Sequence, residues 1–195
     1  MTGGLTSSVD LYWLPLGAGG HSVRLNGRLF EAVVALRRGR KRCDLYHSAL
    51  VVHLPDGRFV IEQGPAGRRG GERGVVAEGA VGARWAGRLR LFRYEVRCWR
   101  DGVIPDVAEA VDSPQRVSDD ERIARRLLEL VPTVPTEVWG RDELRTGEMW
   151  NSNSVISWLL ESAGLPTASL ALPERGRAPG WDAGRAVAGR PSVSA

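Results

Sequence analysis

The sequence predicts an α+β fold in which an antiparallel sheet packs against helices. Two observations carry this prediction. The first half of the chain contains apolar segments with the spacing of strands, two of them joined by the turn signal Pro55-Asp56-Gly57. The second half contains two segments with apolar residues at helical spacing, at residues 121–131 and 151–163. Strands followed by helices are typical of α+β domains.

The strands are expected in the following order. Residues 10–16 form the first, residues 46–54 and 58–62 form the hairpin, and residues 75–78 and 88–99 form two more. Within the last segment the alternation slips by one residue, which indicates a bulge. A further helix with a cationic end is predicted from about Gly27 to Arg38, although Asn26-Gly27 is also a hairpin signal.

Both later helices have start and stop signals. Ser118 with Glu121 predicts a capping box, and Pro132 ends that helix. The last helix follows Trp150 and ends at Ala163-Gly164. Residues 1–174 are therefore expected to form one domain. Residues 175–195 are rich in Gly, Ala and Pro and are predicted to be a poorly ordered tail, in which Trp181 is the residue able to dock.

Composition narrows the function classes. The 195-residue chain is 43% hydrophobic and 26% charged, and no apolar run has the length of a membrane span. No cleavable secretory signal is evident, so a cytoplasmic location is expected. Cys43 and Cys98 lack metal-ligand spacing, which predicts no metal site and no cofactor. The net charge is only +4, and the arginines are interspersed with acidic residues, so nucleic acid is not an expected partner. The alternative is nucleic-acid binding through the Arg-rich segments at 37–42 and 68–73.

One constellation suggests chemistry. The sequence Asn151-Ser152-Asn153-Ser154 begins the last helix, where free N–H groups and the helix dipole favour negative charge. Helical spacing directs Ser152 toward the sheet and leaves Ser154 nearer the rim. His47 begins a strand whose alternation puts it on one face with Ala49 and Val51. Helix capping by Asn and Ser, and a structural role for a lone histidine, are the plain alternatives.

Three separated blocks resemble one known family. Residues 9–14 (VDLYWL), 46–52 (YHSALVV) and 151–155 (NSNSV) are similar, in order, to blocks of the PPPDE family of desumoylating-isopeptidase-like proteins, and to the permuted branch of NlpC-type peptidases. The resemblance covers roughly residues 9–63 and 138–164. It implies a circularly permuted papain-like fold, with a strand histidine at His47 and a helix-start nucleophile at position 152. Where the family has cysteine, this sequence has Ser152.

The resemblance implies an acyl-transfer hydrolase acting on an amide, thioester or ester, with a peptide, a protein or an acyl-bearing small molecule as substrate. Ser152 would be the nucleophile and His47 its base. Glu62 or Gln63 would orient the imidazole, and the residues alone do not choose between them. The Ser152 N–H and the Asn151 amide are candidate oxyanion donors, and Asn153, Ser154 and Trp150 are candidate ligand-binding neighbours. The alternative is an inactive binding protein that keeps the cleft. The oligomeric state is left open.

Overall fold

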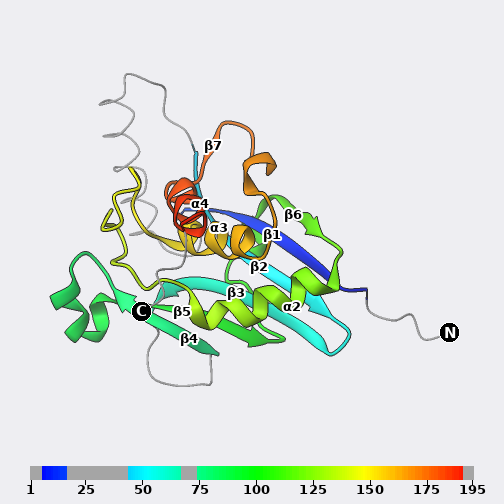
Figure 1. Ribbon diagram of the computed structural model, residues 1–195, viewed down its shortest axis with the longest axis horizontal. Coiled ribbons are helices and arrows are strands. Elements are labelled where there is room, and N and C mark those ends of the chain that lie inside the picture. The colour runs from blue at the N-terminus through cyan, green and yellow to red at the C-terminus, as the bar shows by residue number, and fades with distance from the viewer. Residues whose placement is uncertain (1–5, 17–43, 67–73, 191–195) are drawn as a thin grey trace.

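The computed structural model describes residues 6–16, 44–66 and 74–190. This part of the chain is a mixed α+β structure built on one seven-stranded sheet, antiparallel except at its shortest strand (Figure 1). The strands are β1 (Ser8–Pro15), β2 (Asp44–Leu54), β3 (Gly57–Pro65), β4 (Val75–Ala80), β5 (Arg93–Arg100), β6 (Val111–Ser118) and β7 (Gly176–Arg177). Their order across the sheet is β4-β5-β3-β2-β1-β6, and β7 pairs in parallel with the start of β2.

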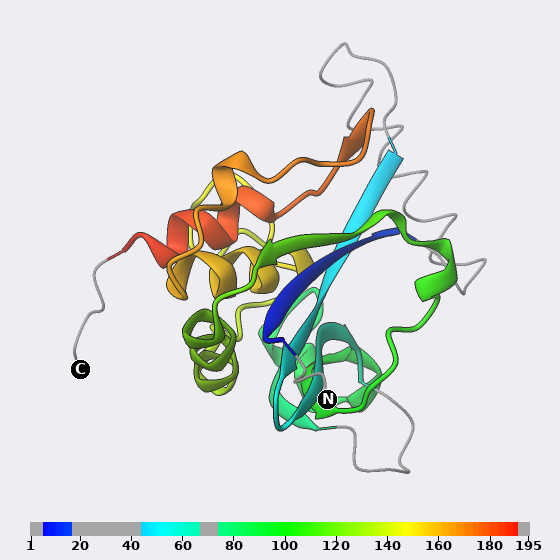
Figure 2. The same cartoon turned by 90° about the vertical axis from the view of Figure 1, so that its right-hand side faces the viewer.

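Three described α-helices lie on one face of this sheet, as Figure 2 shows from the side. They are α2 (Glu121–Leu130), α3 (Ser152–Ser162) and α4 (Trp181–Ala188). The apolar stripe predicted for the last helix is the buried face of α3, because Val155, Ile156, Leu159 and Leu160 have no exposed surface. Burial of each such side chain contributes about 1.5–3 kcal/mol to the free energy of folding.

The two faces of the sheet contribute to separate apolar clusters. In the helix-covered cluster, Leu50 and Val52 of β2 pack with Ile61 of β3 and with α3. In the other cluster, Ala49 and Val51 of β2 pack with Ile104, from the segment that follows β5. Side chains of β2 therefore alternate regularly between the two faces. This alternation matters for His47, which lies between Tyr46 and Ser48.

The predicted hairpin is present, with Leu54 opposite Gly57 at its turn. Several other boundaries were predicted wrongly. Residues 84–92 are not strand: they form two 3-10 helices, η1 (Arg84–Arg88) and η2 (Arg90–Phe92), and β5 begins only at Arg93. The slip in apolar alternation, which was predicted to be a bulge, marks the place where η2 ends and β5 begins. The α2 N-cap is Asp120, whose side chain accepts from the Arg122 N–H, while the Ser118 hydroxyl accepts from the Asp120 N–H.

Residues 175–190 differ most from expectation, because they contain β7 and α4 instead of a poorly ordered tail. Trp181 is 9% exposed, and its ring centroid lies 4.9 Å from that of Trp13 in β1. The helix predicted at residues 27–38, both Arg-rich segments, and Cys43 lie outside the described residues.

Candidate functional site

The start of α3 is fixed by the side chain of Asn151. Its Oδ1 accepts hydrogen bonds from the N–H groups of Asn153 (2.9 Å) and Ser154 (3.4 Å). The Ser154 hydroxyl in turn accepts from the Asn151 N–H at 3.1 Å, which completes a capping box. Asn151 Nδ2 donates to the carbonyl of Pro179 at 2.8 Å. Both polar atoms of the Asn151 amide thereby position the helix and the segment before α4.

Asn153 attaches this helix start to β2. Its Nδ2 donates to the Tyr46 carbonyl at 2.9 Å, and its Oδ1 accepts from the Ser48 hydroxyl at 2.9 Å. Tyr46 and Ser48 are the two sequence neighbours of His47. Both bonds are buried, and Asn153 is 2% exposed. A single side chain therefore holds the N-terminus of α3 against the segment of β2 that carries His47.

This attachment uses an edge that the sheet leaves open. The Leu45 carbonyl accepts from the Leu16 N–H on the β1 side, so the next carbonyl, that of Tyr46, points away from β1. The pairing of β2 with β3 extends no further toward the start of β2 than Leu50 and Ile61. On this edge, β2 pairs with β7 up to Leu45 and with β3 from Leu50 onward. The start of α3 binds the stretch of β2 between them.

His47 is partly buried and stands on the face opposite to Ser48, because neighbouring strand residues alternate. Burial lowers the pKa of His47 to about 4, against the opposing effect of the Asp106 carboxylate. Asp106 has a left-handed backbone (φ 57°) and precedes the 3-10 helix η3 (Val107–Glu109). The imidazole is consequently neutral at physiological pH, which is the form that accepts a proton.

Ser152 is the first residue of α3 and lies between the capping Asn151 and the attaching Asn153. It is 5% exposed. Its N–H is among the first four of the helix, which have no partner within the helix. Within the described ranges no hydrogen bond joins Ser152 to His47. Asn153 joins the start of α3 to the Tyr46 carbonyl and the Ser48 hydroxyl, on either side of His47 in the chain. The His47 side chain itself shares the face of Ala49 and Val51, which is not the face that α3 covers.

Glu62 and Gln63 point to opposite faces of β3. The Glu62 carboxylate accepts from Arg97 Nη1 at 3.0 Å, and Arg97 also binds Glu95 at 2.8 Å. Gln63 is 5% exposed, and neither its Nε2 nor its Oε1 has a hydrogen-bond partner among the residues that the structure describes. It shares the helix-covered face with Ile61, two residues before it. Glu62 is thus committed to an ion pair, while Gln63 has an unused amide.

The remaining predicted neighbours are structural. Trp150 is 2% exposed and packs in the helix-covered core. Ser154 was expected nearer the rim but has no exposed surface, and its hydroxyl donates to the Gly180 carbonyl at 2.8 Å. The expectation was wrong because it assumed that nothing covers this side of α3, where α4 begins.

Other site chemistries find no support among the described residues. No group of three or more His, Cys, Asp or Glu side chains there is arranged to hold a metal ion. Burial raises the pKa of the Cys98 thiol to about 11, so this cysteine is a poor nucleophile. None of the described helices combines the length and the apolar character required to cross a membrane.

Sequence reasoning missed two residues of this neighbourhood. Ser48 follows His47 directly, and an alternation argument alone could have placed it toward α3. Asp106 gave no signal, since it lies in a middle segment whose spacing matches no motif. Comparison of this chain with protein-family models, with curated proteins and with solved structures found no match in any of the three.

Proposed function

We propose that this protein is an acyl-transfer hydrolase with a circularly permuted papain-like fold, in which Ser152 is the nucleophile and His47 the base. The observation that carries the proposal is the side chain of Asn153, which binds both sequence neighbours of His47 and directly follows Ser152. The order in the chain, a strand histidine before a helix-start nucleophile, also agrees with the resemblance described above.

The chemistry follows from the state of each group. The neutral His47 imidazole takes the proton of the Ser152 hydroxyl as its oxygen attacks the carbonyl carbon of an amide, thioester or ester. His47 then gives that proton to the leaving amine, thiol or alcohol, and an acyl-serine forms. Water, deprotonated by the same imidazole, releases the acid and regenerates Ser152. The low pKa of His47 keeps the base unprotonated down to about pH 4.

The oxyanion requires donors that other contacts leave available. The Ser152 N–H at the start of α3 is one, and the helix dipole adds to it. The Asn151 and Asn153 amides are unsuitable, because their Nδ2 atoms donate to main-chain carbonyls. Gln63 Nε2 is buried without a partner on the face of the sheet that α3 covers, and we assign it as the second donor.

The residue that orients His47 is assigned to Asp106. Its carboxylate acts electrostatically on the imidazole, and a carboxylate in this role stabilises the imidazolium that forms during attack. Glu62 is less suited, because its carboxylate already accepts from the buried Arg97. Neither of the two residues predicted from the sequence is then the orienting group.

Reaction with a panel of fluorophosphonates and activated esters, followed by mass mapping, tests the proposal. We expect an adduct on Ser152 in the wild-type protein and at least a roughly hundredfold slower reaction in His47→Ala. Ser162→Ala, which removes a serine at the opposite end of the same helix, is the control and should keep the reaction rate of the wild type. An adduct on any other serine, or equal rates in His47→Ala and the wild type, would overturn the assignment.

The second candidate is a binding protein in which Ser152 holds a peptide or lipid head group without cleaving it. It is favoured by one observation: Ser152 is 5% exposed and makes no hydrogen bond to His47 within the described part of the chain. Absence of any adduct across the whole panel, together with retained folding, would select this candidate.

A further inference from the structure

A projection between β4 and β5 exposes large apolar side chains. It comprises residues 84–92, the two 3-10 helices η1 and η2. In Figure 1 this green segment loops out beyond the left-hand end of the sheet. Its apolar residues with the largest exposed fractions are Trp85 (74%), Leu89 (59%), Leu91 (85%) and Phe92 (42%). Side chains of this size are exposed together where a protein meets a partner or a membrane.

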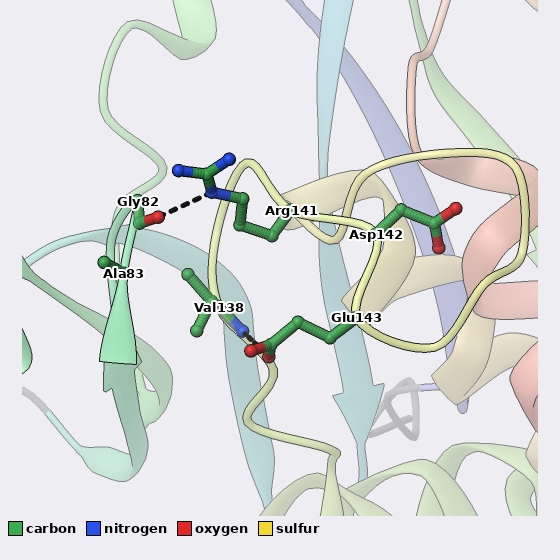
Figure 3. A pocket seen from close by; sticks show the side chains of 6 residues that line it. All are labelled: Gly82, Ala83, Val138, Arg141, Asp142 and Glu143. Carbon is green, nitrogen blue, oxygen red and sulfur yellow. Dashed lines mark hydrogen bonds between the residues drawn. The ribbon is translucent and has the colours of Figure 1, made fainter. Parts of the chain in front are cut away.

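The base of the projection is firmly held, so the exposed tip is a fixed feature. Arg84 Nη2 lies 2.8 Å from carboxylate oxygens of both Glu137 and Glu143. A pocket of about 440 Å³ lies beside this base. Among its lining residues, Arg141 Nε donates to the Gly82 carbonyl at 2.7 Å and Glu143 accepts from the Val138 N–H at 2.9 Å (Figure 3). The charged groups of this pocket serve to anchor the projection.

The chemistry of the projection is cationic and apolar only. The sequence of residues 84–93 is RWAGRLRLFR, with four arginines and no Ser, Thr, Asn, Gln, Tyr or acidic residue. Arg84, Arg90 and Arg93 are paired with carboxylates outside the projection, so the exposed Arg88 supplies its positive charge. No Asp or Glu occurs between Glu78 and Glu95. Specific protein interfaces carry about one hydrogen bond per 100–200 Å². The side chains of this tip can only donate hydrogen bonds and offer no acceptor. A lipid surface requires apolar insertion and positive charge.

We propose that the Arg84–Phe92 projection docks this protein on an anionic lipid surface. Leu89, Leu91 and Trp85 insert at the level of the lipid head groups and glycerol, and Arg88, which is exposed, lies against lipid phosphates. A protruding tip suits insertion into a lipid layer better than it suits a flat protein partner. Anionic lipids of a cytoplasmic leaflet provide the complementary charge.

Co-sedimentation with vesicles tests the proposal directly. The full chain is mixed with vesicles of phosphatidylcholine alone or with 30 mol% phosphatidylserine, a composition chosen as roughly that of an anionic membrane surface. We expect binding to the phosphatidylserine vesicles that weakens as salt rises. Leu89→Ser/Leu91→Ser should lower the partition coefficient at least roughly tenfold, because two inserted leucines are lost. Arg88→Gln should lower it roughly fivefold.

The matched control removes apolar surface elsewhere. Val103→Ser/Leu172→Ser replaces two side chains that are 70% and 41% exposed and should leave vesicle binding unchanged. Urea midpoints of each variant, and the single variant Leu91→Ser, separate lost binding from lost folding. Absence of wild-type binding to either vesicle would overturn the proposal, as would equal loss in the control. Sedimentation velocity adds one more outcome: self-association abolished by Leu89→Ser/Leu91→Ser without vesicle binding would identify a protein interface and reject the membrane.

Discussion

The helix α3 is held on two sides by different physical means. Toward β2, one amide side chain, that of Asn153, makes buried hydrogen bonds to a carbonyl and a hydroxyl. Toward α4, the contact depends on the absence of a side chain, because a Cβ on Gly184 would lie 2.0 Å from the Ser154 carbonyl oxygen. The β2 side is held by directional hydrogen bonds. The α4 side fixes the helix by close backbone approach, which tolerates no added volume.

The largest expected effect comes from the α4 side. Gly184→Val should lower the free energy of unfolding by at least about 3 kcal/mol, because its branched side chain must displace Ser154 and Ser157, the latter 2.1 Å from the new Cβ. Urea denaturation measures the loss. Gly189→Ala, whose Cβ has no neighbour closer than 3.7 Å, is the matched control and should be nearly neutral. Equal stability of the two variants would show that the two helices do not approach as described.

The pH dependence of stability tests whether the imidazole of His47, on β2, is buried and neutral. The pKa of His47 is about 4 in the folded state and about 6.5 in the unfolded chain, so the unfolded state binds more protons between these values. This contribution to stability is full above pH 6.5 and is lost as pH falls toward 4, by as much as about 3 kcal/mol. In His47→Gln this component of the acid sensitivity should disappear. Parallel stability curves for the two proteins between pH 7 and 4 would contradict the buried, neutral imidazole.

The next largest loss of stability is expected when the Asn153 side chain, which attaches α3 to β2, is removed. Asn153→Ala should cost about 2 kcal/mol, because the buried Tyr46 carbonyl and Ser48 hydroxyl lose their partner. The reaction of Ser152 with fluorophosphonates should slow with it, since the helix start is no longer fixed beside His47. Chemical denaturation and labelling rates are measured on the same samples. If Asn153→Ala is less stable but is labelled at the wild-type rate, Asn153 stabilises the fold without positioning Ser152 for reaction.

The smallest effect is expected for the hydroxyl partner. Ser48→Ala removes one hydrogen bond and should cost about 1 kcal/mol. A double-mutant cycle with Asn153→Ala isolates the interaction between them, and coupling of at least roughly 0.5 kcal/mol is expected for two residues in direct contact. Additive losses would mean that the two side chains do not interact.

The sequence predicted the elements that combine apolar periodicity with strong end signals. The hairpin of β2 and β3 followed from Pro55-Asp56-Gly57, and α3 followed from its apolar stripe and from Gly164, which has a left-handed φ of 92°. The strand β6 was missed because it lies at the edge of the sheet and carries Pro and polar residues. Its positions alternate between partly buried and exposed, but the partly buried ones include Ser113 and Gln115, so the sequence has no apolar alternation.

The α4 helix was missed for a related reason. Its Gly and Ala content indicates disorder in isolation, and only the docking of Trp181 and Gly184 on the protein body makes these small residues favourable. Of the candidate site, the sequence predicted His47 and Ser152 from their local motifs. The electrostatic effect of Asp106 and the ion pair of Glu62 depend on tertiary contacts, which no local pattern encodes.

The central proposal is that position 152, next to the attaching Asn153, reacts together with His47. The most direct measurement is the alkylation rate of Ser152→Cys by iodoacetamide as a function of pH, in a Cys43→Ser background, where the raised pKa of Cys98 keeps its own reaction slow. The account predicts a thiol pKa below the ordinary value of about 8.5, and its return toward that value in His47→Ala. An ordinary thiol pKa that is unchanged by His47→Ala would contradict the pairing.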